Sequence, residues 1–189
     1  MEETRHPSLD DRFDPAVRIV DHDPAWAEAA ATEIGRIATA VGEVAVRVDH
    51  VGSTAVPGLA AKPIVDLQLS VAEVGRRDPY AVPLEGIGYL FVPDPDSPDF
   101  HFFAKPAERP RRFHLHVCEA GGEHERRHLA LREYLRAHPD EAARYEALKR
   151  KVVARHPQDR LSYIEGKEQF VTALEGRALA WAGEAGARS

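Results

Sequence analysis

Hydrophobic and polar residues follow different periods before and after residue 120. Between residues 24 and 42, Trp26, Ala30 and Ile37 recur at helical spacing, and the preceding Asp23-Pro24 is typical of an N-cap followed by a first-turn proline. This segment predicts one helix. The other apolar runs of the N-terminal part are short and rich in β-branched or aromatic residues, which predicts strands. The expected strands are residues 17–20, 44–48, 64–71, 89–92, 100–104 and 113–117.

After Gly121-Gly122 the pattern is helical throughout. It predicts three helices, and their expected ranges are 123–137, 140–155 and 159–182. The segment 72–88 is ambiguous, because its prolines and glycines would interrupt a helix. Together the elements predict an α/β (α+β) fold, in which a mixed sheet is followed by a helical C-terminal half.

Length and composition favour one soluble domain. We expect residues 17–182 to form it, residues 1–16 to be a flexible arm and residues 183–189 a frayed tail. The single Cys118 excludes a disulfide framework, and no run of about 18 apolar residues predicts a membrane span. The first residues are charged and no apolar stretch follows them, so we expect no secretory signal and a cytoplasmic location.

The charge balance restricts the partners of the protein. A formal net charge of −6 opposes general binding of nucleic acid, so a site for a polyanion must be local. We therefore expect a small-molecule ligand and no membrane partner. The pattern indicates no particular oligomeric state.

The turn at Gly52-Ser53 is the first candidate site. A glycine lets an anion approach the backbone closely, and the hydroxyls of Ser53 and Thr54 add donors to the exposed N–H groups. These residues are candidates for holding a phosphate. Such a turn is, by itself, more often a plain β-turn with polar residues.

Asp66 lies inside the apolar strand 64–71, where an unpaired carboxylate is costly to bury. Because strand residues alternate between faces, Asp66 shares a face with Lys62 and Gln68. Two interpretations are equally favoured. Asp66 either binds a hard cation such as Mg²⁺ or Mn²⁺ together with phosphate oxygens, or it pairs with Lys62 or a histidine without any ligand.

His114 and His116 lie two residues apart on a predicted strand, so both imidazoles emerge on one face. This spacing occurs in metal sites. We favour a hydrogen-bonded pair that lines a polar crevice, because no acidic third ligand is near in sequence. His50, just before the Gly52-Ser53 turn, is a candidate for the same crevice.

Cationic residues supply the last candidates. Tyr163 and Lys167 are four residues apart and face one way on the last predicted helix, and Lys149 and Lys151 are on the helix before it. Their ammonium groups would neutralise a phosphate, although solvated helix lysines are the more common case. The same two alternatives hold for the basic turn that contains Arg109, Arg111 and Arg112.

Residues 48–69 resemble the signature of the GrpB family (UPF0157 type), a branch of the nucleotidyltransferase superfamily that is sometimes fused to dephospho-CoA kinase. Further resemblances follow in order within residues 17–175. They are Asp23-Pro24-Ala25-Trp26, His114-Leu115-His116-Val117, Tyr134-Leu135-Arg136-Ala137-His138-Pro139 and Tyr163…Lys167…Phe170-Val171. The resemblance implies a polymerase-β-like nucleotidyltransferase sheet flanked by helices, with a helical C-terminal extension.

The superfamily pattern has Gly-Ser, about a dozen residues, Asp-x-Asp or Asp-x-Glu, and a later acid. Here Gln68 takes the place of the second acid, and His114 and His116 lie on the strand where the third is expected. The resemblance therefore implies a transferase with a reduced carboxylate set, in which Asp66 and Asp49 bind Mg²⁺ or Mn²⁺.

In that transferase, His114 or His116 would act as acid or base, the turn Gly52–Thr54 would hold the phosphates, and Lys62, Tyr163 and Lys167 would complete the nucleotide site. The alternative is a non-catalytic module that binds a nucleotide or a CoA-like ligand. A hydrolase with a histidine-bound transition metal is a third, less favoured alternative.

Overall fold

One mixed sheet forms the centre of the fold. The computed structural model describes residues 17–93, 99–106 and 110–186, and in this part of the chain the strands are ordered β1-β2-β5-β4-β3. Their bounds are β1 Ala45–Val51, β2 Val65–Val71, β3 Leu90–Val92, β4 Phe100–Lys105 and β5 Phe113–Glu119. β2 and β5 are parallel, and the other neighbouring strands are antiparallel.

β2 lies between β1 and β5, as its nearly continuous apolar sequence predicts for an internal strand. Leu67 and Leu69 are completely buried on one face. On the opposite face, the pairing register aligns Asp66 with His114 and Gln68 with His116. The parallel register therefore places polar residues from two distant parts of the sequence side by side.

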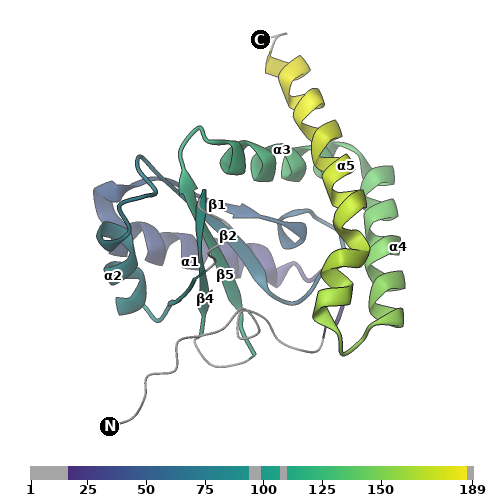
Figure 1. Cartoon of the computed structure of the whole chain (residues 1–189), viewed down its shortest axis with the longest axis horizontal. Helices are drawn as coiled ribbons and strands as arrows, with labels where there is room; N and C mark the ends of the chain where they lie inside the picture. Colours follow the sequence, from purple (N-terminus) through teal and green to yellow (C-terminus); the bar gives the residue numbers. More distant parts are fainter. Residues whose placement is uncertain (1–16, 94–98, 107–109, 187–189) are drawn as a thin grey trace.

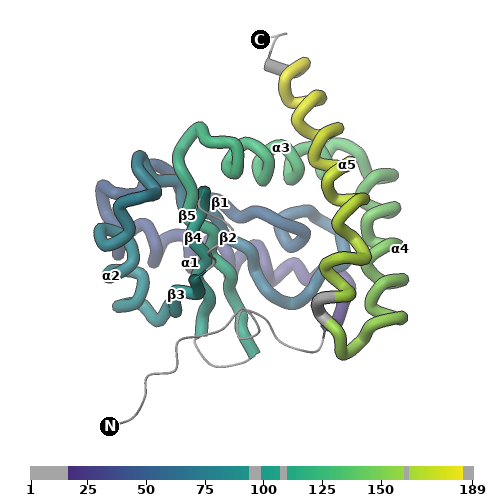
Figure 2. The backbone as a smooth tube through the Cα atoms, viewed as in Figure 1, coloured from purple at the N-terminus to yellow at the C-terminus, as the bar shows by residue number. Residues whose placement is uncertain are grey.

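The helices form two groups around the sheet (Figure 1). α1 (Ala25–Val41) and α2 (Asp78–Gly86) pack on the apolar face of β2 and β5. α3 (Glu123–Ala137), α4 (Pro139–Arg155) and α5 (Arg160–Gly186) form the second group, which packs around its own apolar cluster. The backbone tube places β3 close to α2, away from this second group (Figure 2). The polar face of β2 and β5 is thus left for α3 and its neighbours.

The predicted helices and most predicted strands are confirmed. The helices lie within two residues of the expected bounds, except that α5 continues to Gly186, so residues 183–186 are helical. Asp23 caps α1 as expected, since its Oδ1 accepts a hydrogen bond of 2.9 Å from the N–H of Ala25. The expected arm (1–16), the residues 187–189 and the loop 94–98 lie outside the described residues.

One expectation is wrong, and one ambiguous segment is resolved. Residues 17–20 form no strand, because only Val20 makes a β-bridge, to Ala61. The segment 72–88 contains α2 despite its prolines. Pro79 lies in the first turn, where no N–H is needed.

The burial of two residues accounts for the remainder of α2. Tyr80 and Leu84, one turn apart, are completely buried in the core. Their packing offsets the loss of the backbone hydrogen bond that Pro83 cannot make. Among the helices that the structure describes, none combines the length and the apolar character needed to cross a membrane.

Candidate functional site

A cavity of about 350 Å³ lies between the polar face of the sheet and the C-terminal helices. It is lined by most of the residues that the sequence singled out for chemistry. They are Gly52, Ser53, Lys62, Asp66, His114, His116, Tyr163 and Lys167. The fold therefore brings together candidates that are spread over more than 100 residues of sequence.

The Gly52-Ser53 turn packs directly against Asp66. Gly52 has a φ of 70°, and a Cβ at this position would lie 2.8 Å from Oδ2 of Asp66. Only glycine combines this backbone conformation with such a close approach. The short 3₁₀ turn η3 (Ser53–Ala55) follows immediately, so the hydroxyl of Ser53 is presented beside the carboxylate.

Asp66 is held as a carboxylate. Burial by itself raises the pKa of Asp66, but the hydrogen bond and charge of His114, together with Lys62, hold it well below its usual range. The Oδ1 of Asp66 lies 3.3 Å from Nδ1 of His114. The Asp66 side chain keeps 26% of its surface exposed, so it pairs with a histidine and also faces the cavity.

Lys149 of α4, one of the helix lysines that the sequence offers as cationic candidates, is a central residue of the site. Its side chain is 2% exposed, and its Nζ donates to Ser53 Oγ at 3.0 Å and to the carbonyl oxygen of Ala60. Burial, followed by the nearby charge of Lys167, lowers the pKa of Lys149 to about 7. Its helical stripe with the buried Tyr145 and Val152 could have indicated that it points inward.

Tyr163 and Lys167 enter the cavity from α5. The Nζ of Lys167 lies 5.5 Å from the centre of the Tyr163 ring, as their four-residue spacing predicts for neighbours on one helix face. Tyr163 is buried, and Lys167 is half-buried. The ammonium groups of Lys149 and Lys167 thus approach the Ser53 turn from two different helices.

Three other candidates lie beside the cavity and do not line it. Thr54 is buried, and its hydroxyl lies 2.9 Å from Nε2 of His50. Burial lowers the pKa of His50 to about 4. Asp49 accepts hydrogen bonds from Arg47 and Arg132. The structure therefore does not place Thr54, His50 or Asp49 where they would contact a ligand in the cavity.

The basic turn is also separate from the site. Arg111 is buried, and the exposed Arg112 lies 5.9 Å from the ring centre of Phe113. Neither lines the cavity. Arg109 lies outside the described residues.

Position 68, where the superfamily pattern has its second acid, has a different environment. Gln68 is completely buried, and its Oε1 lies 2.9 Å from Nδ1 of His128 in α3. His128 itself lines the cavity. His128 is not among the candidates predicted from the sequence, although its spacing of four from His124 on a predicted helix was a usable signal.

A family model described as GrpB protein matches residues 16–177. The chain belongs to the GrpB family. Its fold is similar to the crystal structure of conserved protein GrpB from Enterococcus faecalis, with a TM-score of 0.80 and 32% identity over 87% of this chain and 99% of that one. The expected α+β fold of a nucleotidyltransferase-like family is thus confirmed.

Curated relatives extend the comparison. UPF0157 protein PA4798 of Pseudomonas aeruginosa is 38% identical over 88% of this chain and 69% of its own length. UPF0157 protein SCO7215 of Streptomyces coelicolor is 36% identical over 86% of this chain and 84% of its own. A dephospho-CoA kinase of Mycolicibacterium paratuberculosis is 32% identical to this GrpB chain. The match includes 90% of this chain but only 48% of the length of that kinase.

The oxygen ligands of the cavity do not fit a pair of Mg²⁺ ions. Among the described residues, the acids that line it are Asp66 and Glu175, and Glu175 accepts a hydrogen bond of 3.1 Å from Arg127. Two bridged cations require several carboxylates. One Mg²⁺ or Mn²⁺, held by Asp66 and by the phosphates of a ligand, fits the residues present.

Proposed function

We propose that this GrpB-family protein binds a phosphate-bearing small molecule, of nucleotide or CoA type, in the cavity. The observation that carries this proposal is that three lysines line the cavity that contains the Gly52-Ser53 turn, in a protein with a net charge of −6. Lys62, Lys149 and Lys167 all line the cavity, against two carboxylates.

Lys149 is the strongest single argument for an anionic ligand. Its ammonium group is buried beside a second cation, and its two hydrogen-bond partners, Ser53 Oγ and the oxygen of Ala60, are neutral. A lysine has three donors, so one N–H is left over for a ligand. A phosphate in the cavity would supply the counter-charge that the protein does not place in contact with this group.

The rest of the lining suits the non-phosphate part of such a ligand. Aromatic and aliphatic side chains make up the remaining wall, and they are Phe100, Phe102, Leu131, Tyr145, Ile164 and Val171. Small-molecule pockets typically combine apolar walls of this kind with a few polar groups. Relatives named dephospho-CoA kinase favour a CoA-type ligand among the phosphate esters.

A second candidate function is transfer of a nucleotidyl or phosphoryl group from the bound ligand. The Asp66–His114 pair favours it, because a carboxylate beside an imidazole is a common acid–base arrangement. An acceptor hydroxyl would attack phosphorus and its proton would pass to an imidazole. The leaving group would be pyrophosphate in nucleotidyl transfer and the nucleoside diphosphate in phosphoryl transfer. A Mg²⁺ ion bound by Asp66 would supply charge neutralisation at the phosphates.

A thermal-shift screen tests ligand binding. Nucleoside triphosphates, CoA and dephospho-CoA are added with Mg²⁺ or with a chelator, and a ligand that binds only the folded protein raises Tm. We expect Lys149→Met to lose the shift and Lys151→Met, an exposed lysine on the same helix, to keep it. Equal shifts in both variants, or no shift with any of these compounds, would contradict the proposal.

Transferase activity needs a separate measurement. Release of pyrophosphate or of nucleoside diphosphate from the bound nucleoside triphosphate is followed with candidate hydroxyl acceptors, and we expect Asp66→Asn to abolish it. If the ligand binds and neither product appears with any acceptor, the protein is a binding module and the second candidate function fails.

A further inference from the structure

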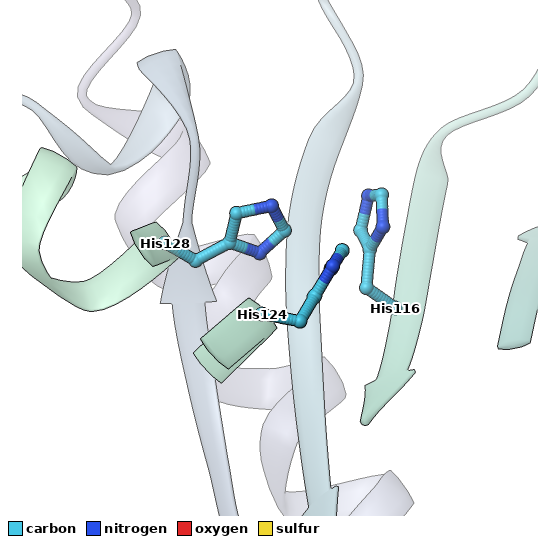
Figure 3. A group of neighbouring side chains, drawn as sticks. All are labelled: His116, His124 and His128. Atoms are coloured by element: carbon cyan, nitrogen blue, oxygen red, sulfur yellow. The ribbon is translucent and has the colours of Figure 1, made fainter. Parts of the chain in front are cut away.

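Three histidines from β5 and α3 converge at the side of the cavity. One ring nitrogen from each of His116, His124 and His128 lies within 4.8 Å of the other two (Figure 3). Their ring centres are 4.3 to 5.7 Å apart. His124 and His128 project from successive turns of α3, and His116 faces them from the sheet.

Hydrogen bonding leaves nitrogen lone pairs available in this cluster. The Nδ1 of His128 lies 2.9 Å from the side-chain amide oxygen Oε1 of Gln68, so Nδ1 carries the proton and Nε2 keeps its lone pair. His116 Nδ1 and His124 Nε2 are buried and have no hydrogen-bond partner within the part of the chain that the structure describes. Buried polar atoms without partners are unusual and costly, and a bound cation would remove that cost.

The buried, aromatic surroundings of the cluster favour the uncharged form of its imidazoles. Phe100 stacks on His124 at 4.3 Å between ring centres, and burial lowers the pKa of His116 to about 3 and that of His124 to about 4. Metal-binding histidines must be deprotonated, and these are neutral at pH 7. All three side chains are half-buried, and His116 and His128 line the cavity, so an ion has a route of entry.

We propose that His116, His124 and His128 bind a single first-row transition-metal dication, with Zn²⁺ the preferred ion. Imidazole is a ligand of Zn²⁺, Cu²⁺, Fe²⁺ and Ni²⁺, whereas Mg²⁺ requires oxygen. Three protein ligands leave one coordination position for water or for an anionic ligand of the cavity. Bond lengths of about 2.0–2.1 Å require the three nitrogens to draw closer together than 4.8 Å when the ion binds.

Gln68 has a defined part in this proposal as a positioning residue. Metal-bound histidines usually donate their second N–H to a carbonyl or carboxylate, which fixes the tautomer and the ring orientation. The Gln68–His128 hydrogen bond is this arrangement. It explains why an amide is accommodated at the position where a two-Mg²⁺ site would need an acid.

Metal binding is measured without any nucleotide, so its outcome is independent of the proposed function. Protein without an affinity tag is stripped with a chelator and titrated with Zn²⁺ by calorimetry and with Co²⁺ by visible spectroscopy. We expect one equivalent of each and a Co²⁺ d–d spectrum typical of four or five ligands. X-ray absorption at the zinc edge should show three imidazoles.

The variants identify the ligands. His124→Ala and His128→Ala should each weaken binding by about 100-fold or more, since loss of an outer-shell partner alone costs about 10–100-fold. His156→Ala, which changes a histidine between α4 and α5, should bind like wild type. Gln68→Leu should weaken binding about 10–100-fold, and Gln68→Glu, which keeps an acceptor, should restore it.

Circular dichroism of the metal-free variants establishes that they are folded. If a variant does not fold, the Co²⁺ spectrum and the zinc-edge absorption of the wild type still test whether the protein binds a metal ion through histidines. Absence of stoichiometric Zn²⁺ and Co²⁺ binding to wild type, or a zinc edge without imidazole scattering, would overturn the proposal. The proposal would also be overturned if the folded variants His124→Ala and His128→Ala bound Zn²⁺ with wild-type affinity.

Discussion

The α-carbon of Gly52 faces the carboxylate of Asp66 so closely that a Cβ at position 52 would lie 2.8 Å from Oδ2. The turn and the acid are therefore one structural unit, although 13 residues of sequence separate them. Any ligand held by the backbone of the turn meets this carboxylate. The spacing between the Gly-Ser pair and the acid thus has a direct geometric meaning.

Gly52→Ala should lower stability and remove ligand binding together. Gly58→Ala is the matched control, because Gly58 also has a positive φ (79°) and a Cβ there would meet no atom within 4 Å. The backbone strain should cost about 1–3 kcal/mol in either variant, with the larger value at Gly52, whose φ of 70° and ψ of −169° lie in a region that is almost exclusive to glycine. Urea unfolding should show a larger loss for Gly52→Ala, because the collision adds to it, and equal losses would contradict the contact.

Phosphate binding should be accompanied by proton uptake at Lys149. An anion favours the charged amine and raises its pKa from about 7, so at pH 7 up to about half a proton should be bound with the ligand. Calorimetry in two buffers of different ionisation enthalpy measures this uptake. Affinity should fall as pH rises above 7, and Lys149→Met should lose the buffer dependence.

In Lys151→Met the buffer dependence should remain, since Lys151 is exposed on the same helix. If the binding enthalpy of the wild type is identical in both buffers, Lys149 takes up no proton when the ligand binds, and the prediction is wrong.

Asp66→Asn should destabilise the protein at neutral pH and much less in acid. The folded-state pKa of Asp66 lies below its unfolded value, so the carboxylate contributes stability above about pH 4, and this contribution is lost as pH falls further. Removing the charge-assisted bond to His114 should cost about 1–3 kcal/mol at pH 7.

Denaturant unfolding of wild type and Asp66→Asn at pH 7 and pH 3 tests this expectation. The difference in unfolding free energy should narrow at pH 3. The exposed Asp21 offers a control, since Asp21→Asn should remain close to wild type at both values. A difference for Asp66→Asn that is the same at both pH values would exclude the linkage.

Ser53 and Thr54 should differ in their effect on ligand affinity. Thr54→Val removes the hydrogen bond to His50 and should cost about 1 kcal/mol of stability without changing ligand affinity. Ser53→Ala removes an acceptor from the buried Lys149 at the cavity, so it should weaken affinity about tenfold and also cost about 1–3 kcal/mol of stability. Titration calorimetry and urea unfolding of both variants measure the two effects, and a reversed pattern of affinities would place Thr54 in the site.

The apolar periodicity of α1, α3 and α4 was enough to predict their bounds, because helix formation depends on residues within a few positions of one another. The same holds for the Asp23 cap and for the strand nature of β2 and β5. α2 was missed because its stability rests on Tyr80 and Leu84 packing in the core, which local sequence does not report.

Motif resemblance and strand alternation also located Gly52, Ser53 and Asp66 at the site, since these depend on short spacings. The choice of Lys149 over Lys151, the inclusion of His128, and the separation of Asp49 and Thr54 from the cavity followed from long-range contacts. Neighbouring residues in the chain dictate where an element forms and which face it presents. The parallel register of β2 on β5 and the packing of three distant helices dictate which of those faces meet, and that choice lies in contacts between residues far apart in sequence.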